Sequence, residues 1–446
     1  MLVRVALLSY RSKPHSGGQG IYVRHLSSEL VALGHDVEVF SGQPYPELDP
    51  GVRLTKVPSL DLYADENPFR TPHPREIRDL TDVIEVATMW SAGFPEPRTF
   101  ARRVAPLLLE RRDDFDVVHD NQTLGSALLD VQDALPFVET IHHPISLDRR
   151  VDLAAARGRK KLTTLRWYGF VRMQARVARR LQRILTVSQS SATDIAREFG
   201  VDPKRIHVVP LGVDDAFRPP ATPRIPGRII AMASADTPLK GIATLLEAVA
   251  ALVRDGREIE LVLVTRPKPG GPTEKRIESL GLAARVRVVN GLSDDELGAY
   301  VGSAEIACVP SLYEGFSLPT AEAMACGTPL VVSRAGAIPE VVGDPGVCAD
   351  LVTPGDPREL AAALGALLDD PQRRAAMGAA GRARALERFT WRAVAEATAQ
   401  EYADAISAHP NAAAQPVVTR PSTVDAVTQP AESPDPDDQE ARIAVR

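Results

Sequence analysis

The sequence predicts an α/β protein made of two tandem, doubly wound Rossmann-like domains with a ligand-binding cleft between them. Three observations support this fold class. Short apolar segments alternate with helical segments in the first half of the chain, the same alternation returns in the second half, and a proline-rich stretch at residues 208–227 separates the two series. The length of 446 residues also exceeds that of one ordinary hydrophobic core.

The first series predicts a domain over residues 1–208. Residues 3–9 are expected to form a buried strand, and residues 20–35 carry apolar side chains at close to helical spacing. Because strands alternate with helices, we expect a parallel sheet with helices on both faces. The other predicted strands lie at residues 36–41, 52–57, 116–119, 137–142 and 183–188.

The second series predicts a domain over residues 209–389. A long helical pattern covers residues 242–256. Ligands of such sheets bind at the carboxyl ends of the strands, so the cleft between two facing domains is the expected site. The predicted strands lie at residues 228–234, 259–265, 286–291, 305–310 and 329–333.

The end of the chain divides into a helix and a tail. Residues 390–407 have the pattern of a helix. Residues 408–446 are rich in proline, alanine, serine and acidic side chains and lack periodicity, which predicts a disordered segment.

Composition excludes several classes of protein. The net charge of −6 gives no reason to expect a nucleic-acid partner, which favours a basic surface. The three cysteines have no metal-ligand spacing, and such a sparse set is typical of a reducing, intracellular compartment. No apolar run approaches the length of a membrane span. We therefore expect a cytoplasmic protein, at most peripheral on the inner face of the membrane.

Two glutamates in the segment SLYEGFSLPTAEAMACGTPLVV suggest a binding site. Glu314 lies in the loop after a predicted strand, and Glu322 lies about one turn into the following helix. The N–H groups near Phe316, Leu318 and Thr320 would attract a phosphate, and carboxylates accept hydrogen bonds from hydroxyls. A nucleotide sugar offers both a diphosphate and hydroxyls. Glu322 would accept hydrogen bonds from a ribose diol, and Glu314 would accept one from a sugar hydroxyl. The alternative is a solvated loop residue and a glutamate that merely favours the helix start.

This segment resembles the nucleotide-sugar-binding segment of retaining glycosyltransferases of family four, which have the GT-B fold and carry two glutamates separated by seven residues. The resemblance extends over residues 2–405. Other segments that carry it lie at residues 16–41, 185–200, 207–219, 291–311 and 336–370.

The resemblance implies donor-binding residues. The N–H groups of Gly315, Phe316, Ser317 and Leu318 would face the donor phosphates, together with the two glutamates. The glycine-rich loop SKPHSGGQG resembles the family loop that reaches the donor diphosphate, and Gly17 and Gly18 are carried over to that role. A glycine-rich turn alone is weak evidence, since it is usually just a turn.

Positive charge for the donor diphosphate comes from one expected lysine and one hypothetical arginine. Lys240 matches the family lysine that binds the donor phosphate, with a solvated lysine as the alternative. The family usually has an arginine five or six residues earlier, where this chain has Ser234 and Ala235. We advance the hypothesis that Arg266, at the end of the next strand, supplies the missing charge. The alternative is a surface arginine.

Three histidines follow predicted strands. His142 fits the register of a family histidine near the transferring sugar, where it can donate a hydrogen bond to sugar or phosphate. His143 and His119 are assigned to the acceptor side. For each, a structural or capping histidine is the alternative.

Residues 149–183 hold twelve arginines or lysines and a single acidic residue, with Trp167, Tyr168 and Phe170 between them. Such a stretch can contact anionic lipid at a membrane or an anionic acceptor. The ordinary alternative, which we favour, is a solvated helix whose aromatic side chains pack inward.

The resemblance implies a retaining hexosyltransferase that works without a metal ion or a cofactor. It would move a hexose, with mannose and glucose as first candidates, from a nucleoside diphosphate sugar to a hydroxyl of a saccharide or lipid-linked acceptor. His142, Glu314 and Lys240 are assigned catalytic roles. No Asp-x-Asp metal motif ends a predicted strand. Two alternatives stay open, a non-catalytic sugar-nucleotide binder and a nucleotide-sugar epimerase of the same fold.

Overall fold

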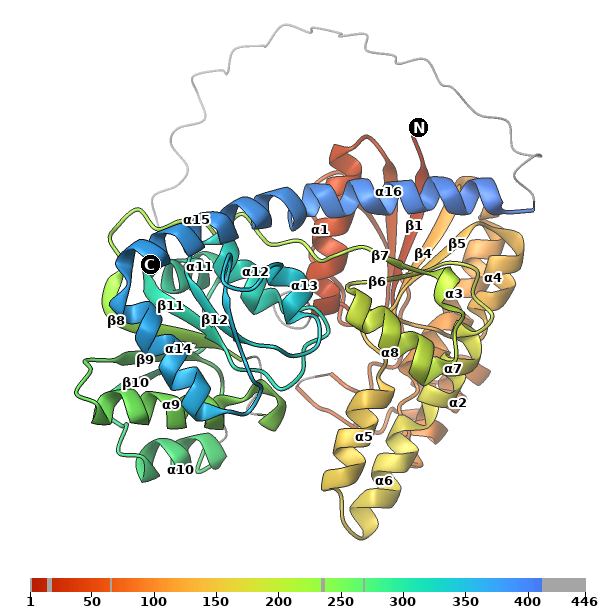
Figure 1. Cartoon of the computed structure of the whole chain (residues 1–446). Helices are drawn as coiled ribbons and strands as arrows, with labels where there is room; N and C mark the ends of the chain where they lie inside the picture. The colour runs from red at the N-terminus through yellow and green to blue at the C-terminus, as the bar shows by residue number, and fades with distance from the viewer. Residues whose placement is uncertain (1, 14–17, 65, 234–236, 268, 411–446) are drawn as a thin grey trace, which may run out of the picture. The chain divides into compact units, whose positions relative to one another are not determined.

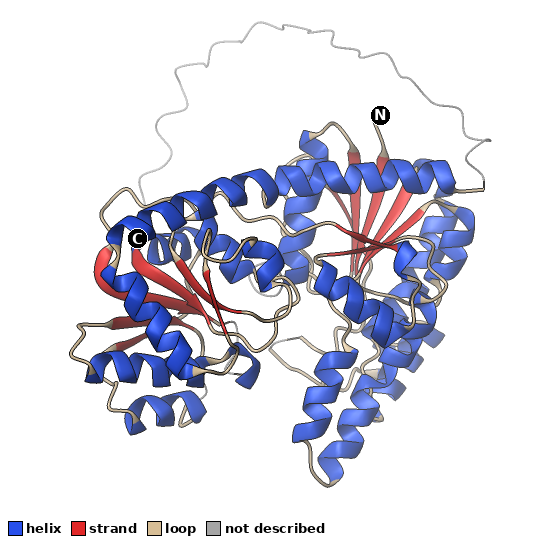
Figure 2. Cartoon of the chain, viewed as in Figure 1, coloured by secondary structure: helices blue, strands red, loops and turns tan. Residues whose placement is uncertain are grey.

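Two parallel β-sheets organise the chain in the computed structural model, which describes residues 2–13, 18–64, 66–233, 237–267 and 269–410. Both sheets belong to one compact unit, Met1–His409. Helices flank both sheets (Figures 1 and 2). This confirms the predicted fold class. The predicted disordered tail, residues 408–446, lies outside the described residues except for its first three.

The first sheet has seven strands in the order β3-β2-β1-β4-β5-β6-β7, all parallel. With α1–α8 it forms what we call the N-terminal lobe. The strands are β1 (Arg4–Ser9), β2 (Asp36–Ser41), β3 (Arg53–Lys56), β4 (Val117–Asn121), β5 (Phe137–Thr140), β6 (Ile184–Thr186) and β7 (Ile206–Val208). The helices are α1 (Gly18–Ala32), α2 (Leu80–Trp90), α3 (Glu96–Glu110), α4 (Leu128–Ala134), α5 (Ser146–Ala155), α6 (Arg159–Trp167), α7 (Val171–Ala178) and α8 (Gln189–Phe199).

The second sheet has six strands in the order β10-β9-β8-β11-β12-β13, also parallel. With α9–α15 it forms the C-terminal lobe. The strands are β8 (Ile225–Met232), β9 (Glu260–Val264), β10 (Val286–Val289), β11 (Ala304–Val309), β12 (Leu330–Ser333) and β13 (Asp350–Val352). The helices are α9 (Ile242–Arg254), α10 (Pro272–Ser279), α11 (Asp294–Ser303), α12 (Leu318–Ala325), α13 (Ile338–Val342), α14 (Pro357–Asp369) and α15 (Pro371–Arg388).

Each sheet is buried on both faces, which explains its apolar strands. In β1, Leu7 and Leu8 are both fully buried and belong to different hydrophobic clusters, one on each face of the sheet. In β8, Ile229 and Ile230 divide in the same way. Side chains alternate between faces along a strand, so a strand covered on both sides reads as a continuous apolar run.

The last helix of the described residues, α16 (Trp391–Ala408), packs against the N-terminal lobe (Figure 1). Trp391, Val394 and Tyr402 join the cluster that contains Val5 and Leu7 of β1. Among the described residues, no helix is both long and apolar enough to cross a membrane.

Strand order in both sheets places two pairs of loops where ligands of such folds bind. In the first sheet the order reverses between β1 and β4, and in the second between β8 and β11. Loops that leave neighbouring strands in opposite directions open a crevice at their carboxyl ends. Lys240 follows β8 and Glu314 follows β11, so the topology itself brings these two predicted residues together.

Candidate active site

Glu314 and Lys240 form an ion pair at the carboxyl ends of β8 and β11. The Nζ atom of Lys240 lies 2.9 Å from Oε1 of Glu314, and the Ser311 hydroxyl donates to the same oxygen at 2.6 Å. Glu314 is buried, whereas about a quarter of the Lys240 side chain (23%) is exposed. The anionic partner of Lys240 in this structure is therefore a protein carboxylate.

Close backbone contacts fix both residues of the pair. Gly241 adopts a left-handed conformation at φ 66°, and a Cβ atom there would lie 1.9 Å from the carbonyl oxygen of Pro310. The Leu312 N–H also donates to the Leu239 carbonyl at 2.7 Å. Only glycine permits this approach, and it holds the short 3₁₀ turn Pro238–Lys240 against the loop that carries Glu314.

The loop from Gly315 to Ser317 presents backbone N–H groups at the start of α12. Within the part of the chain that the structure describes, the N–H groups of Gly315, Phe316 and Ser317 have no partner. Ser317 has a left-handed φ of 85°, an uncommon conformation for a residue with a side chain. The Phe316 side chain packs on Phe389 in the core, which leaves the Phe316 backbone, not its ring, available to a ligand. Free N–H groups at a helix start favour an anion such as phosphate.

Glu322 lies inside α12, near further carboxylates. Burial and, secondarily, the negative charges of Asp294 and Asp214 raise the pKa of Glu322 to about 8. The half-buried carboxyl group is therefore mostly protonated at neutral pH when no ligand is bound.

The loop of Glu314 touches the N-terminal lobe at Gly315. Ser188 and Ser191 donate hydroxyl hydrogen bonds to the Gly315 carbonyl at 2.6 and 3.0 Å. A Cβ atom at Gly315 would lie 3.3 Å from the Ser191 hydroxyl and 3.7 Å from the carbonyl oxygen of His142. The structure thus places His142 beside the loop that carries Glu314.

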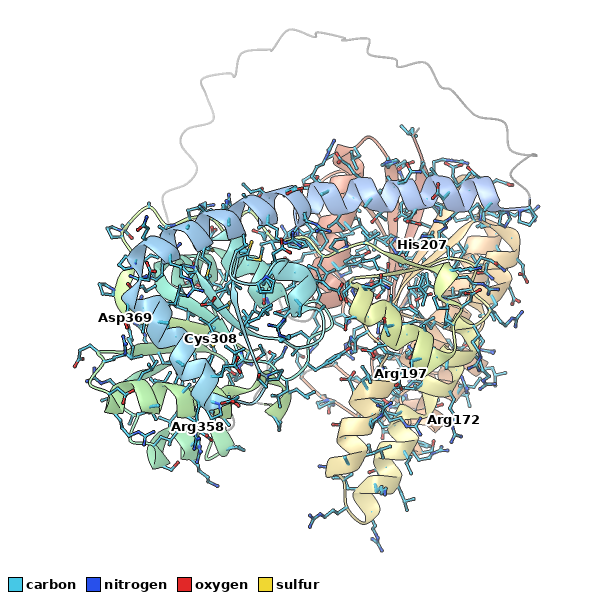
Figure 3. All side chains as sticks on the ribbon, in the orientation of Figure 1. Arg172, Arg197, His207, Cys308, Arg358 and Asp369 are labelled. Carbon is cyan, nitrogen blue, oxygen red and sulfur yellow. The ribbon has the colours of Figure 1, made fainter. Side chains whose placement is uncertain are left out.

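A second set of contacts joins the lobes at α8. The Glu340 carboxylate accepts the N–H groups of Gln189 and Ser190, both at 2.7 Å. The Tyr313 hydroxyl donates to Asp194, which also pairs with Arg197 of the same helix. Arg197 is labelled in Figure 3. The N-terminus of α8 therefore faces a carboxylate of the C-terminal lobe. The dipole of α8 favours a negative charge at this end.

His142 is held by residues that follow β4. Its ring Nε2 lies 2.8 Å from Oδ1 of Asn121, and its backbone N–H donates to Oε1 of Gln122 at 2.8 Å. The ring of Tyr22 packs edge-on against it, with centroids 4.8 Å apart. Burial, and to a lesser degree His143, lowers the pKa of His142 to about 3. The ring is neutral, and with Nε2 donating to Asn121 its Nδ1 is left as an acceptor for a hydroxyl.

The other two histidines have different surroundings. His143 is half-buried, and its Nε2 lies 2.8 Å from Asp148 of α5. His119 is fully buried inside β4, with Nδ1 at 2.7 Å from the Tyr402 hydroxyl and Nε2 at 2.7 Å from the Thr140 hydroxyl. Both ring nitrogens of His119 have protein partners, so it does not lie on an acceptor surface here. The reason is that β4 continues two residues beyond His119, to Asn121.

The remaining predicted donor residues are partly outside the described chain. Gly17, Ser234 and Ala235 lie outside the described residues. Gly18 is exposed at the first position of α1. Arg266 is exposed just beyond β9, the neighbour of β8 in the sheet. Its assignment to the diphosphate stays a prediction.

Several residues that position the site were not predicted from sequence. They are Asn121 and Gln122, which hold His142 and His143, and Ser188, Ser191 and Glu340, which join the lobes. The signal that could have found the first two is a run of polar residues directly after a buried strand. Among the described residues, no three His, Cys, Asp or Glu side chains are grouped as a metal site would require.

Comparison with known proteins gives the family. Residues 16–217 match the model of Glycosyltransferase Family 4, and residues 215–384 match that of Glycosyl transferases group 1. The chain is 60% identical over 407 residues to the MMP alpha-(1->4)-mannosyltransferase of Mycolicibacterium hassiacum, a match that covers 91% of this chain and 99% of that protein. It is 33% identical over 440 residues to the D-inositol 3-phosphate glycosyltransferase of Xylanimonas cellulosilytica, which covers 91% and 98%.

Solved structures show the same fold. A sucrose-phosphate synthase from Thermosynechococcus elongatus superimposes with a TM-score of 0.68 at 24% identity, covering 91% of this chain and 100% of that one. An Anabaena protein in complex with UDP and glucose superimposes with a TM-score of 0.63 at 18% identity, covering 90% and 99%. Sequence identity across nearly the whole chain, the two family models and the fold agree: the protein belongs to the family-four glycosyltransferases.

Proposed function

We propose that this glycosyltransferase moves mannose from a nucleoside diphosphate mannose to a hydroxyl of a mannoside acceptor and forms an α-(1→4) linkage. The observation that carries the proposal is the 60% identity to an α-(1→4)-mannosyltransferase over 99% of that protein. An α-linked donor and an α-linked product require retention of the anomeric configuration.

The residues of the candidate active site have roles in this proposal. Lys240 and the N–H groups of Gly315, Phe316 and Ser317 neutralise the donor diphosphate. Glu322 accepts hydrogen bonds from the ribose hydroxyls. The Nδ1 atom of His142 accepts a hydrogen bond from a hydroxyl of mannose. These groups are arranged before the reaction, which is how a site stabilises charge that develops on the leaving diphosphate.

The chemical step breaks the bond between the anomeric carbon and the diphosphate oxygen. The acceptor oxygen bonds to the same carbon on the same face, and its proton passes to a leaving diphosphate oxygen. Because the diphosphate gains negative charge, Lys240 contributes more in the transition state than in the bound donor. Contacts between the lobes at Gly315 and Glu340 would help to exclude water from this step.

Donor binding must rearrange the Lys240–Glu314 pair. Glu314 is 2.9 Å from Lys240, and an incoming phosphate competes for the same ammonium group. Release of Glu314 frees its carboxylate to accept a hydrogen bond from a hydroxyl of the transferring sugar. The proposal requires no metal ion, since Lys240, Arg266 and the α12 N-terminus supply positive charge.

The test is product analysis. GDP-mannose and UDP-glucose are each incubated with a short α-(1→4)-mannoside, with and without a chelator, and the products are analysed by NMR. We expect an added α-linked mannose, unaffected by chelation. Donor binding without turnover would instead indicate a non-catalytic binder, and a changed sugar without transfer would indicate an epimerase. Either result contradicts the proposal.

Contact with an anionic membrane is a second candidate, limited to the outer face of α6. Leu162 and Leu165 are exposed there, with Arg159 and Lys161 exposed beside them. Against it, Trp167 and Tyr168 pack inward, as the ordinary interpretation of residues 149–183 predicts. Co-sedimentation with phosphatidylglycerol vesicles tests this candidate, and no binding by the full-length protein would reject it.

A further inference from the structure

A pocket in the N-terminal lobe lies apart from the residues assigned above. It has a volume of about 370 Å³, within the range of small-molecule sites. It opens between α6, the end of α2 and the loop that precedes α2, and one residue of α5 also lines it. Neither the donor-binding residues nor His142 line it.

Aromatic side chains form its walls. The ring of Trp167 lies 5.7 Å from that of Tyr63 and 6.3 Å from that of Phe69, measured between centroids. Phe69 and Trp90 are 60% and 67% exposed, so both rings present apolar surface to solvent. Exposed apolar surface of this kind is typical of a ligand site.

The backbone at the pocket is strained in two places. Phe69 has φ 65° and Ala92 has φ 59°, both left-handed conformations in residues that carry a side chain, and both line the pocket. Such conformations cost free energy and occur where the surrounding structure holds them, often at binding sites. Here they lie at Phe69, whose ring lines the pocket, and in the turn after Trp90.

Polar groups at the pocket suit a neutral ligand rich in hydroxyls. The Tyr168 hydroxyl donates to Oδ2 of Asp152 at 2.7 Å, and Oδ1 of Asp152 is not part of that contact. Lys160 is the single cation of the lining and Asp152 the single anion, so their formal charges cancel. The lining itself therefore offers no net positive charge to an anionic headgroup, although Arg159 and Lys161 are exposed outside it. A pyranose offers an apolar C–H face to the rings and hydroxyls to these polar groups.

The pocket is joined to the active site by α5. This helix begins at Ser146, with two residues between it and the His142–His143 pair, and Asp148 contacts His143. Asp152 follows one turn later, about 6 Å along the helix axis. On the other side, Phe94 packs against both Trp167 and Tyr10, and Tyr10 directly follows β1. The pocket therefore lies at the end of the sheet where His142 lies.

We propose that this pocket binds a sugar unit of the acceptor chain, away from the hydroxyl that receives the transferred sugar. The inference rests on the proposed mannosyl transfer, since the bound unit would be part of the same mannoside. An enzyme with such a subsite acts more readily on long acceptors than on short ones.

The test compares acceptor lengths. Trp90→Ala removes the most exposed ring of the pocket, and Leu386→Ala, on α15 with 53% exposure, is the matched control. We expect the KM for a long α-(1→4)-mannoside to rise about tenfold in Trp90→Ala, with the KM for a disaccharide acceptor and the kcat unchanged. Leu386→Ala should match the wild type for both acceptors. An equal KM for the long mannoside in all three proteins would overturn the proposal.

Direct binding separates this inference from the proposed function. Calorimetric titration of the full-length protein with the long mannoside, without donor, needs no turnover. Binding by the wild type that Trp90→Ala weakens supports the pocket even if no mannose is transferred. Absence of binding by the wild type overturns it. If Trp90→Ala instead loses binding to phosphatidylglycerol vesicles while its mannoside affinity is unchanged, the pocket contacts lipid and the inference is wrong.

Discussion

Lys240 and Glu314 neutralise each other across the carboxyl ends of two neighbouring strands, with 2.9 Å between Nζ and Oε1. The lysine is thus held in position before any phosphate arrives, and the glutamate is held away from solvent. In the proposed mechanism, donor binding to Lys240 would release the Glu314 carboxylate, which could then bind the sugar.

Replacement of Lys240 should therefore weaken donor use. We expect Lys240→Ala to lower kcat/KM for the donor by about 10- to 100-fold, the range for loss of a charge-assisted hydrogen bond. Lys240→Arg should keep part of the activity, since it retains the charge but not the shape of the ammonium group. The exposed Lys275 of α10 is the matched control, and Lys275→Ala should be unchanged. The check is kcat/KM for the donor, measured by steady-state kinetics at varied donor concentration in all four proteins. Full activity of Lys240→Ala would remove Lys240 from the site.

Glu322 should make donor affinity depend on pH. Its pKa of about 8 means that the carboxylate form, which accepts two ribose hydroxyls best, becomes populated only as pH rises through this value. We expect donor Kd, measured by calorimetry, to fall between pH 7 and 9 in the wild type and to stay constant in Glu322→Gln. A parallel pH dependence in both proteins would contradict the ribose role.

The same pKa predicts a trend in stability without ligand. Because the pKa of Glu322 is raised in the folded protein, its protonated form is favoured there, and stability is lost as pH rises from about 4.5 through about 8. Glu322→Gln should reduce this loss. The check is the urea midpoint at pH 6 and pH 9 for both proteins.

Glu340 should stabilise the contact between the lobes. Its carboxylate accepts two N–H groups at the start of α8, so Glu340→Ala leaves both without a protein acceptor. By analogy with loss of an N-cap, we expect the free energy of unfolding to fall by roughly 0.5–1 kcal/mol. Glu387→Ala, at an exposed position of α15, is the control. An unchanged urea midpoint in Glu340→Ala would show that this contact contributes nothing.

Asp120 and Glu139 should share one proton in the core of the N-terminal lobe. They are direct neighbours on β4 and β5, and both are fully buried. Burial raises the pKa of both, and that of Glu139 lies well above its usual range. A protonated Glu139 can donate to Asp120, and the amide of Glu139→Gln can do the same. We expect Glu139→Gln to retain stability within about 1 kcal/mol and Glu139→Ala to lose about 3 kcal/mol. Thermal unfolding at neutral pH would distinguish them, and equal losses would exclude the shared proton.

The fold was predictable because parallel strands covered on both faces carry continuous apolar runs. Residues 3–9 and 305–310, for example, correspond to β1 and β11. Boundaries were less predictable where polar residues continue a strand. His119 looked like a strand end because aspartate and asparagine follow it, yet Asp120 and Asn121 still pair with β5.

The positions of Glu314 and Lys240 after neighbouring strands were predictable, but their contacts were not. The motif pointed to Glu314 and Lys240, whereas their ion pair depends on the order of β8 and β11 in the sheet, which no local pattern records. Ser188 and Ser191 look like an ordinary helix start, and Ser188 does cap α8. Their second role, toward Gly315, depends on how the two lobes meet and leaves no mark on the surrounding sequence.

The position of α16 has a consequence for biosynthesis. Its Tyr402 hydroxyl meets His119 inside the first sheet, and Trp391 stacks on His25 of α1. The N-terminal lobe, which leaves the ribosome first, therefore cannot complete its packing until α16 has been synthesised. We expect stalled nascent chains that end before Trp391 to remain protease-sensitive in their first 208 residues. If such chains already resist digestion, the late helix is dispensable for that half.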